Sequence, residues 1–593
     1  MTKDFSRPQE YYQARLKTLQ QTASKQKSQL RTLSLLRLLV FLIAAFTTYS
    51  FYKGLGSLLY TALPGVIVFF YLISRYTDLL KANKKVHKLI DLNNLELKVL
   101  QREFADLPTG IEYNDPNHEF SRDIDLFGKG SFFQYINRTA LPEGTTNLAN
   151  ILKANEINGI PQKQEALIEL SQHADWRQEF TASAALIHTE LSTSVLLKWI
   201  HQYKPFTPPK TKIVSILFSI SSFIIILLVS ADLILERLAL LWFFVGLGIT
   251  GFYLKGINRL SAQTTKIRST FDQYHQLMLL LENKQFESGY LQSFLEPIQK
   301  KGLQSSVLLK QFSKALDALD QRNNMLFGVL ANGLLLWDLY QCRRIETWIQ
   351  RNGNEVQRWF DLVSFFDAYN SLGNFVFNHP TFDFPKIVSN TNRIRATNVS
   401  HPLIDPARSV ANSLLLIDEE FLIITGANMA GKSTFLRTVS LLVVMANTGL
   451  PVCAEAVEYN PIKLITSMRT SDSLTDDESY FFSELKRLKF VVEAIAKENY
   501  FVILDEILKG TNSTDKANGS KKFIEKLVKS GVTGMVATHD LSLCELEEAI
   551  PKVNTYYFDA EIVNDELYFD YKLKKGVCQN MNASFLLKKM KIV

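Results

Sequence analysis

Four uncharged runs of residues interrupt the mixed polar and apolar pattern in the first half of the chain. They cover residues 38–52, 54–74, 213–231 and 238–254. A helix that spans a membrane needs about 20 apolar residues, and about 17 is the lower limit. Only a short link separates the runs within each pair, so the pattern predicts two transmembrane helical hairpins, over 38–74 and 213–254. The alternative for each run is a buried helix in the core of a soluble region.

A fifth apolar stretch, from Met325 to Trp337, has a different pattern. It is only 13 residues long, Asn332 interrupts it and Asp338 follows it. This length is below the requirement for a membrane span. We therefore expect a buried helix of a soluble region here.

Basic residues flank the outer ends of both predicted hairpins, while the links inside the hairpins carry little positive charge. The flanking residues are Arg31, Arg37, Arg75, Lys81, Lys84, Lys85, Lys210, Lys212, Lys255 and Arg259. Because cytoplasmic flanks are enriched in Lys and Arg, this pattern predicts a multi-pass membrane protein with four spans. The N-terminus and the whole C-terminal half are then cytoplasmic. No ionisable residue lies inside the runs to mark a transport path, so we expect them to act as anchors.

The distribution of charge supports this interpretation. Residues 1–110 contain 16 Lys+Arg against 7 Asp+Glu and thus carry +9, whereas the whole chain of 593 residues carries +7. A basic excess confined to one end favours a membrane flank over a general nucleic-acid surface, although a local DNA-binding patch elsewhere stays open. The four cysteines are far apart and form no CxxC pair, which argues against a zinc site or a disulfide framework.

A glycine-containing motif, GANMAGKS, lies between a strand-like stretch (421–425) and a helix-like one (433–446). It fits G-x-x-x-x-G-K-[ST] in full. In such a loop, backbone N–H groups surround phosphates, the lysine reaches the β- and γ-phosphates, and the serine binds Mg²⁺. The motif predicts an ATP site made of Gly426, Ala427, Asn428, Met429, Ala430, Gly431, Lys432, Ser433 and Thr434.

Two further strand-like stretches end in candidate catalytic residues. The stretch YFVILDE ends in Asp505 and Glu506, and GMVATHD carries His539 at its end. In an α/β sheet, ligands bind at the carboxyl ends of the strands. We expect Asp505 to hold the Mg²⁺ shell, Glu506 to orient or deprotonate the attacking water, and His539 to sense the γ-phosphate. Taken alone, solvated carboxylates at a strand end and an incidental histidine are the ordinary alternatives.

Between these stretches, an amphipathic helix is predicted from Ser479 onward. Apolar residues recur at spacings of three and four, at Phe482, Leu485, Leu488, Val492 and Ile495. Three acidic residues precede Ser479, at the helix end where the dipole favours negative charge. The segment is either a capped surface helix or a helix N-terminus offered to a second nucleotide across a dimer interface.

Together, the segments TGANMAGKSTFLR, DEILKGTNSTD and ATHD closely resemble the ATPase domain of the DNA mismatch-repair MutS family, which belongs to the ABC-type ATPases. This resemblance implies ATP and Mg²⁺ as cofactors, with Lys432, Glu506 and His539 in catalysis and with Ser433 and Asp505 as metal ligands. It also implies a homodimer in which Ser479 reaches the ATP of the partner. Asp515 matches the acidic position of the loop that follows the Walker B strand.

The segment SHPLIDPARSVANS (400–413) resembles the part of the family that helps to hold adenine. Ser409 stands where many relatives have an aromatic residue, so base stacking at this position is an open question. Upstream, residues 125–144 and 160–170 are similar to the start of the helical core and lever of the family. Residues 1–110 contain no counterpart of its mismatch-reading domain.

The expected fold is an α/β C-terminal P-loop (ABC-type) ATPase domain joined to a mostly α-helical core and lever region with two transmembrane hairpins. The expected segments are a basic cytoplasmic segment (1–37), hairpin 1 (38–74), a first core and lever segment (75–212), hairpin 2 (213–254), a second core and lever segment (255–394) and the ATPase domain (395–593).

The favoured function is a membrane-anchored, dimeric MutS-like ATPase in which ATP drives a conformational change. One alternative is a membrane-tethered protein that binds mismatched or branched DNA, which the MutS resemblance supports and the missing reader domain opposes. The other is an ABC-type transporter motor, which the few, uncharged spans oppose. DNA is thus a possible partner that the sequence alone does not establish.

Overall fold

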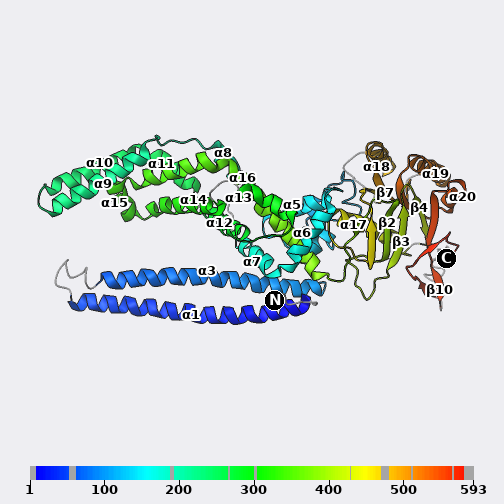
Figure 1. Cartoon of the computed structure of the whole chain (residues 1–593), viewed down its shortest axis with the longest axis horizontal. Coiled ribbons are helices and arrows are strands. Elements are labelled where there is room, and N and C mark those ends of the chain that lie inside the picture. The colour runs from blue at the N-terminus through cyan, green and yellow to red at the C-terminus, as the bar shows by residue number, and fades with distance from the viewer. Residues whose placement is uncertain are drawn as a thin grey trace.

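The computed structural model describes residues 8–51, 62–186, 192–264, 267–299, 304–427, 429–468, 480–508, 512–563 and 566–579. The molecule is elongated, with a mostly helical region along most of its length and an α/β domain at one end (Figure 1). This division agrees with the expected separation of a helical region from a C-terminal α/β domain.

The N-terminal hairpin consists of two long helices that lie side by side, α1 (Pro8–Phe51) and α3 (Leu63–Leu100) (Figure 1). The predicted basic segment and the first apolar run form one continuous helix, so no structural break lies between residues 37 and 38. The base of the hairpin packs on the helical core, where the buried hydroxyl of Tyr12 donates a hydrogen bond of 2.7 Å to Asn378 Oδ1. The apolar ends of the two helices point away from the α/β domain.

One helix of 42 residues, α16 (Trp337–Asn378), forms the spine of the helical region. At a rise of 1.5 Å per residue it is about 63 Å long. Around it lie shorter helices: η1 (Ile111–Tyr113), α4 (Phe132–Ile136), α5 (Pro142–Lys153), α6 (Ile160–Gln172), α7 (Ala174–Ala184), α8 (Thr193–Gln202), α12 (Arg268–Glu282), α13 (Gly289–Gln299), α14 (Ser305–Asp320) and η2 (Gln321–Asn323).

Buried carboxylates attach neighbouring segments to this spine. Asp367 accepts hydrogen bonds from the backbone N–H groups of Ala140 and Leu141, at the start of α5. Burial raises the pKa of Asp367 to about 7. Further along α16, the fully buried Glu346 accepts from Tyr203 Oη at 3.1 Å and from the backbone N–H of Phe206 at 2.8 Å. The loop that leads into the second hairpin is therefore held by α16.

The second hairpin is α9 (Thr211–Ser230) and α10 (Glu236–Phe252), and α10 bends by 66° into α11 (Leu254–Thr264). A third apolar helix, α15 (Met325–Leu335), packs against both α9 and α10. The expectation of a buried helix at this position is wrong, because Met325 and Leu326 are 81% and 77% exposed. Length and hydropathy do not determine whether an apolar helix is covered by protein.

Among the described residues, three helices have the length and apolar composition needed to cross a membrane: α1, α3 and α9. Two bent helix pairs meet the same criteria together, α10 with α11 and α15 with α16. Many of their large apolar side chains are exposed, and the hairpin ends lie at the end of the molecule remote from the α/β domain (Figure 1).

The main sheet of the α/β domain has the strand order β12-β9-β4-β8-β7-β6, with only β12 antiparallel to its neighbour. Its strands are β4 (Phe421–Gly426), β6 (Lys463–Ser467), β7 (Tyr500–Asp505), β8 (Thr533–Ala537), β9 (Val553–Phe558) and β12 (Leu573–Lys575). The smaller sheet, of order β1-β5-β2-β3, contains β1 (Lys386–Ile387), β2 (Asn392–Val399), β3 (Asn412–Ile417) and β5 (Ala456–Tyr459), and β10 (Glu561–Val563) pairs with β11 (Glu566–Tyr568).

Helices cover both faces of the main sheet, which explains why its central strands are almost entirely apolar. Leu422 and Ile424 of β4 pack in the same core as α17 (Lys432–Thr448). Phe421 and Ile423 face the opposite core, which contains side chains of α18 (Tyr480–Ile495) and α19 (Ser513–Lys529). The short η3 (Leu541–Glu545) and α20 (Leu546–Ala549) complete this side.

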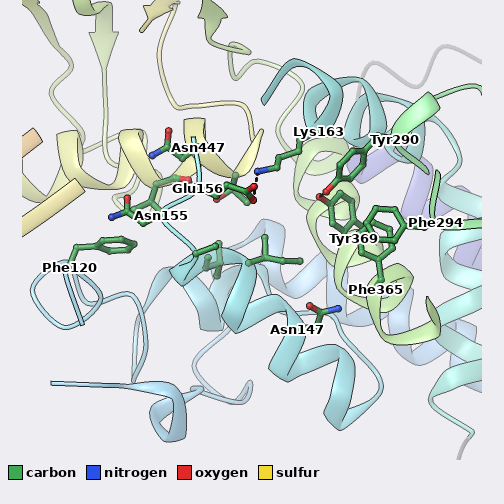
Figure 2. Close-up of a pocket in the computed structure, with 15 residues that line it drawn as sticks. Phe120, Asn147, Asn155, Glu156, Lys163, Tyr290, Phe294, Phe365, Tyr369 and Asn447 are labelled. Atoms are coloured by element: carbon green, nitrogen blue, oxygen red, sulfur yellow. Dashed lines mark hydrogen bonds and ion pairs between the residues drawn. The ribbon is translucent and has the colours of Figure 1, made fainter. Parts of the chain in front are cut away.

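The helical region is joined to the edge strand of the main sheet by polar contacts. The Asn155 side chain donates to Leu464 O at 2.9 Å and accepts from Leu464 N at 2.8 Å. The backbone N–H of Thr466 donates to Glu119 O at 2.9 Å. Next to this joint lies a cavity of about 200 Å³, with Asn447 of α17 on one side and Tyr369 of α16 on the other (Figure 2).

Candidate nucleotide-binding site

The candidate site lies at the carboxyl ends of three adjacent parallel strands. The predicted strands are confirmed as β4, β7 and β8, and β8 lies between the other two. This order brings the loop after β4, the acidic pair after β7 and the histidine after β8 to one edge of the sheet. The predicted helix after the loop is also confirmed, as α17.

The loop from residue 426 to 431 turns directly into α17. Gly426 and Gly431 have φ values of 141° and 105°, which side chains other than glycine rarely adopt. The first backbone hydrogen bond of the helix runs from Phe435 N to Gly431 O, so the helix itself does not use the preceding N–H groups. Ser433 and Thr434 are exposed at this helix start. An anion can therefore approach backbone donors and the positive end of the helix dipole.

The remaining loop positions differ in their exposure. Ala430 is fully buried and Ala427 is half-buried, whereas Met429 is 80% exposed and has φ 67°. Asn428, the other residue of the predicted Asn-Met pair, lies outside the described residues. Most of the Met429 side chain is therefore accessible to solvent.

The Lys432 side chain folds back onto its own loop. Its Nζ donates to the carbonyl oxygens of Gly426 and Ala427, at 2.8 Å each, and lies 3.3 Å from His539 Nε2. Burial lowers the pKa of Lys432, while Asp505 and Glu506 act in the opposite direction. The two carbonyl oxygens hold the Lys432 ammonium in place, and a phosphate that enters the cavity can attract it away from them.

His539 lies between an ammonium and a carboxylate. The same atom, Nε2, is 3.3 Å from Lys432 Nζ and 3.2 Å from Glu506 Oε1. Burial, followed by the charge of Lys432, lowers the pKa of His539. A neutral imidazole nitrogen either accepts a hydrogen bond from Lys432 or donates one to Glu506, but it does not do both at once. A change at either neighbour therefore changes the hydrogen bonding of the other.

The turn after β7 has an unusual backbone. Glu506 and Leu508 have φ values of 47° and 59°, in the left-handed region, and Glu506 N donates to Ala537 O at 2.9 Å. Residues held in this region often belong to functional sites. The buried Glu484 of α18 accepts a hydrogen bond from Leu508 N, which links α18 to this turn. The sequence analysis missed Glu484, whose signal was its position four residues before Leu488, on the same side of the helix.

A cavity of about 910 Å³ connects these groups. Lys432, Ser433, Asp505, Glu506 and His539 all line it, as do Gly431, Met429 and Thr434.

The cavity is also lined by Ser409 and by an aromatic residue that the sequence analysis missed, Tyr571. Asn412 positions this tyrosine, because its side chain donates to Tyr571 O at 3.0 Å and accepts from Leu573 N at 2.8 Å. The ring of Tyr571 lies close to Gly431 and stacks on Phe569. An aromatic surface is therefore present in the cavity although Ser409 does not provide it.

Among the described residues, several predicted ones do not line this cavity: Gly426, Ala427 and Ala430 of the loop, and Asp515 of α19. Ser479 lies outside the described residues. Asp515 is exposed in the first turn of α19, where its N–H and its carboxylate both bond to the side chain of Asn512. Within one chain, Asp515 therefore contributes to a helix cap.

The predicted amphipathic helix is confirmed as α18, but its predicted buried face is only partly right. Leu488 is buried, whereas Phe482 and Leu485 are 50% and 37% exposed. The inward positions are instead occupied by Glu484 and Val491. The spacing of apolar residues identified the helix. The face that packs on the sheet differs from the predicted one, because it contains the buried Glu484 and leaves Phe482 and Leu485 exposed.

The residues present fit a nucleotide with Mg²⁺. Ser433 and Asp505 offer hydroxyl and carboxylate oxygens on one cavity wall, and oxygen ligands are what Mg²⁺ prefers. The charge of Lys432 and the start of α17 at this residue suit phosphates, and the Tyr571 ring suits a planar base.

The comparisons with known proteins agree with this arrangement. Residues 422–590 match the family model of MutS domain V. The chain is 32% identical to the DNA mismatch repair protein MutS of Macrococcus caseolyticus over 202 residues, 33% of this chain and 24% of that protein. It is 34% identical to that of Aquifex pyrophilus over 182 residues, 30% of this chain and 21% of that protein.

A human relative is similar to the same extent. MutS protein homolog 4 of Homo sapiens is 30% identical over 193 residues, which cover 31% of this chain and 20% of that protein. The chain thus spans about a quarter or less of the length of these curated relatives. The α/β domain is similar to MutS domain V and links the chain to proteins of DNA mismatch repair.

Proposed function

We propose that this protein is a membrane-anchored ATPase related to MutS, which binds and hydrolyses ATP and uses the cycle to move its helical region. The observation that supports this most strongly is the convergence of Lys432, Asp505, Glu506 and His539 on one cavity at the carboxyl ends of parallel strands.

The chemistry follows from the positions of these side chains. Lys432 leaves the carbonyls of Gly426 and Ala427 and pairs with the phosphates of the substrate. Glu506 accepts a proton from the attacking water on its carboxylate, and His539 changes its partner between Lys432 and Glu506 as the γ-phosphate arrives and leaves. Ser433 and Asp505 would hold Mg²⁺, which would supply positive charge to the phosphate oxygens when bound.

The proposed active form is a homodimer with two composite sites. Asp515 does not line the cavity of its own chain, and we assign it, together with Ser479, to the nucleotide held by the partner. The exposed Phe482 and Leu485 on α18 follow Ser479 closely in sequence and supply apolar surface that dimer formation can bury.

We further propose that α18 and α17 transmit the closure of the dimer to the helical region. Arg487 of α18 donates to Glu119 O at 2.6 Å and to Thr466 O at 2.8 Å, and lies 3.9 Å from Asp123 Oδ2. Arg437 of α17 forms an ion pair of 3.1 Å with Asp125. Both cations contact the same loop of the helical region. A movement of α17 or α18 would therefore act directly on this loop.

The membrane anchors in this proposal are α1 with α3 and α9 with α10. Their apolar ends lie at the same end of the molecule, opposite the α/β domain, which is the arrangement that a single bilayer requires (Figure 1). The basic flanks assign the N-terminus and the ATPase domain to the cytoplasmic side. The six expected segments, from residues 1–37 to 395–593, describe roles within this proposal and are not separate structural units, because α1 continues through residues 37 and 38 and β2 through residues 394 and 395.

A combined binding and flotation experiment tests this proposal. The full-length chain is reconstituted in phospholipid vesicles, floated on a density gradient and titrated with a fluorescent ATP analogue and Mg²⁺. We expect the native chain to float and to bind the analogue, Glu506→Gln to do the same, and Lys432→Ala to float without binding. Failure to float contradicts anchoring, and equal binding by Lys432→Ala contradicts the assigned site.

The similarity to proteins named for DNA mismatch repair favours DNA binding as a second candidate function. Binding to homoduplex, mismatched and branched DNA is measured across a salt series. Contacts to phosphates predict affinity that falls steeply as salt increases. Absence of binding at low salt excludes this second function.

A further inference from the structure

The helix α15 combines three properties that a soluble helix rarely has together. It is strongly apolar, it ends at a sharp bend, and one of its faces is uncovered. Met325, Leu326, Val329 and Leu330 lie at positions that share one side of a helix, and all four are exposed, Leu330 by 56%. The opposite side, with Ala331, Asn332 and Gly333, is buried.

The buried side of α15 packs on the second hairpin. A Cβ atom on Gly246 of α10 would collide with the carbonyl oxygen of Gly333, so the two backbones are in direct contact. Ser219 of α9 donates a hydrogen bond of 3.2 Å to Leu335 O. The exposed face of α15 is therefore continuous with the apolar surface of α9 and α10, which carries exposed side chains such as Ile216, Leu217, Ile220 and Leu241.

These contacts also show how far along the second hairpin α15 lies, and therefore how deep it lies in the proposed bilayer. Ser219 is eight residues from the start of α9 at Thr211, and Gly246 is six residues from the end of α10 at Phe252. At 1.5 Å per residue, α15 meets the hairpin about 9–12 Å beyond its cytoplasmic base. This is close to the depth of about 5–10 Å at which amphipathic helices lie in the interface of a bilayer.

The length and direction of α15 exclude a membrane-spanning helix. Its 11 residues are about 16 Å long, roughly half the thickness of the hydrocarbon core. The helix cannot continue into α16 as a span, because Asp338, Arg343 and Arg344 follow the bend. The bend is 83°, and α16 runs along the long axis of the molecule, so α15 lies nearly perpendicular to that axis (Figure 1).

We infer that α15 is an in-plane membrane helix, with Met325, Leu326, Val329 and Leu330 among the acyl chains of the cytoplasmic leaflet. This inference rests on the proposed anchoring of α9 and α10 in the bilayer. The occupant of the exposed face is lipid, because the face is uninterrupted apolar surface that continues that of the hairpin.

The junction between α15 and α16 is fixed by several contacts. Leu336 has φ 50° and is fully buried at the bend. Asn332 Oδ1 accepts from Asp338 N at 2.9 Å, and Arg322 forms an ion pair of 2.9 Å with the buried Asp338 carboxylate. The bend is therefore held by contacts from both helices and from η2.

Depth-dependent fluorescence quenching tests the inference. An environment-sensitive thiol probe is attached to Leu326→Cys or Leu330→Cys in the full-length chain, reconstituted in phosphatidylcholine and phosphatidylglycerol vesicles. The vesicles contain lipids with a quencher either near the headgroup or near the chain end. Ile224→Cys, about 20 Å along α9, marks a deep position, and Lys489→Cys on α18 marks an aqueous one. The unsubstituted chain gives the background of its four native cysteines.

We expect the ratio of shallow to deep quenching to be above one at positions 326 and 330 and below one at 224, with no quenching at 489. Quenching at 224 without quenching at 326 and 330 overturns the inference and leaves the anchoring intact, and a second copy or another protein then covers α15. Deep quenching that dominates at 326 and 330 also overturns it, in favour of a re-entrant segment. Absence of quenching at all positions overturns the anchoring itself.

Discussion

At the scale of single residues, the candidate site depends on groups that each have two possible partners. Lys432 is held by loop carbonyls that cannot compete with a phosphate, and His539 Nε2 lies within 3.3 Å of both an ammonium and a carboxylate. Negative charge that enters the cavity can compete for each of these groups. The residues that the proposal assigns to ATP turnover are thus close together in the cavity.

Tyr571 leads to a prediction about the base of the nucleotide. Stacking of a base on an aromatic ring contributes about 1–3 kcal/mol. We expect Tyr571→Ala to weaken ATP binding about 10-fold, because 1.4 kcal/mol corresponds to a factor of 10, and Tyr571→Phe to retain the affinity. Inorganic triphosphate, which has no base, should bind equally to all three proteins.

The control is Tyr568→Ala, which removes an exposed tyrosine of β11 outside the cavity. Equilibrium titrations with both ligands measure the effect. An equal loss of affinity for triphosphate and ATP in Tyr571→Ala would show that the tyrosine supports the loop and does not hold the base.

His379, at the end of α16, leads to a prediction about pH. Burial lowers its pKa from 6.5 to about 4, and its Nε2 lies 2.8 Å from Tyr135 Oη. Because the unfolded chain takes up this proton below pH 6.5 and the folded chain does not, folding stability is complete above pH 6.5 and decreases as the pH falls toward 4. Between pH 7.5 and 5 this histidine should account for a loss of about 2 kcal/mol.

The measurement is thermal or urea unfolding at the two pH values, in native protein and in His379→Gln. The variant should lose less stability on acidification, whatever its stability at neutral pH. His87→Gln, at an exposed position on α3, should keep the native pH dependence. An unchanged pH slope in His379→Gln contradicts the assignment.

At the scale of elements, the apolar helices α10 and α15 meet through small residues, while many of their large side chains remain exposed. This is the packing typical of helices in membranes. The contact between Gly246 and Gly333 brings α10 and α15 together, while Trp242 Nε1 donates to Ser222 Oγ at 2.8 Å between α10 and α9. The three helices therefore form one unit at the end of the spine.

A pair of glycines on α10 tests this unit. A Cβ at Gly246 collides with the backbone of α15, whereas a Cβ at Gly248 meets nothing within 4 Å. We expect Gly246→Val to reduce the free energy of unfolding by about 1–3 kcal/mol, the usual effect of overpacking, and Gly248→Val to leave it nearly unchanged. Thermal unfolding in vesicles measures both. Equal effects of the two substitutions would mean that α15 does not pack on α10 at this position.

The extent of prediction from sequence also differs between elements. β4, β7 and β8 were predictable because each is a short apolar run next to a chemically specific residue. The exposure of α15 was not, because apolar composition suits a protein core and a lipid surface equally. The buried face of α18 was predicted only in part, because the hydrogen bond between Glu484 and Leu508 overrides the simple apolar spacing.

At the scale of the whole molecule, the candidate site and the apolar helices lie at opposite ends, and α16 connects them (Figure 1). The candidate phosphate loop at residues 426–431 could be identified from the sequence because its motif is local. Tyr571 could not, since it reaches the site through a contact with Asn412, 159 residues away. The contacts of Asn155, Glu119 and Asp123 with β6 could not be predicted either, because they join segments that are far apart in the sequence.

Arg487 leads to a prediction about the contact between α18 and the helical region. Burial lowers the pKa of its guanidinium, and its partners are two carbonyls and the Asp123 carboxylate. We expect Arg487→Ala to reduce unfolding free energy by about 3 kcal/mol, because it leaves buried acceptors without a donor, while the affinity for ATP is retained.

Lys489→Ala on the exposed side of the same helix is the matched control. Lys489 forms a surface pair with Glu493, so its loss should change stability by about 0.5 kcal/mol or less. Denaturant unfolding and ATP titration measure the two quantities. If Arg487→Ala and Lys489→Ala behave alike, this contact does not depend on Arg487.

The central claim is that the cavity at the carboxyl ends of β4, β7 and β8 hydrolyses ATP in a chain that is anchored in a bilayer. The most direct measurement is the rate of ATP turnover by full-length protein in floated vesicles, with and without Mg²⁺, for the native chain and Glu506→Gln. The account predicts Mg²⁺-dependent turnover that falls by about 10²-fold or more in Glu506→Gln, with ATP binding retained. Turnover that is unchanged in Glu506→Gln, or absent from the native chain although ATP binds, would contradict it.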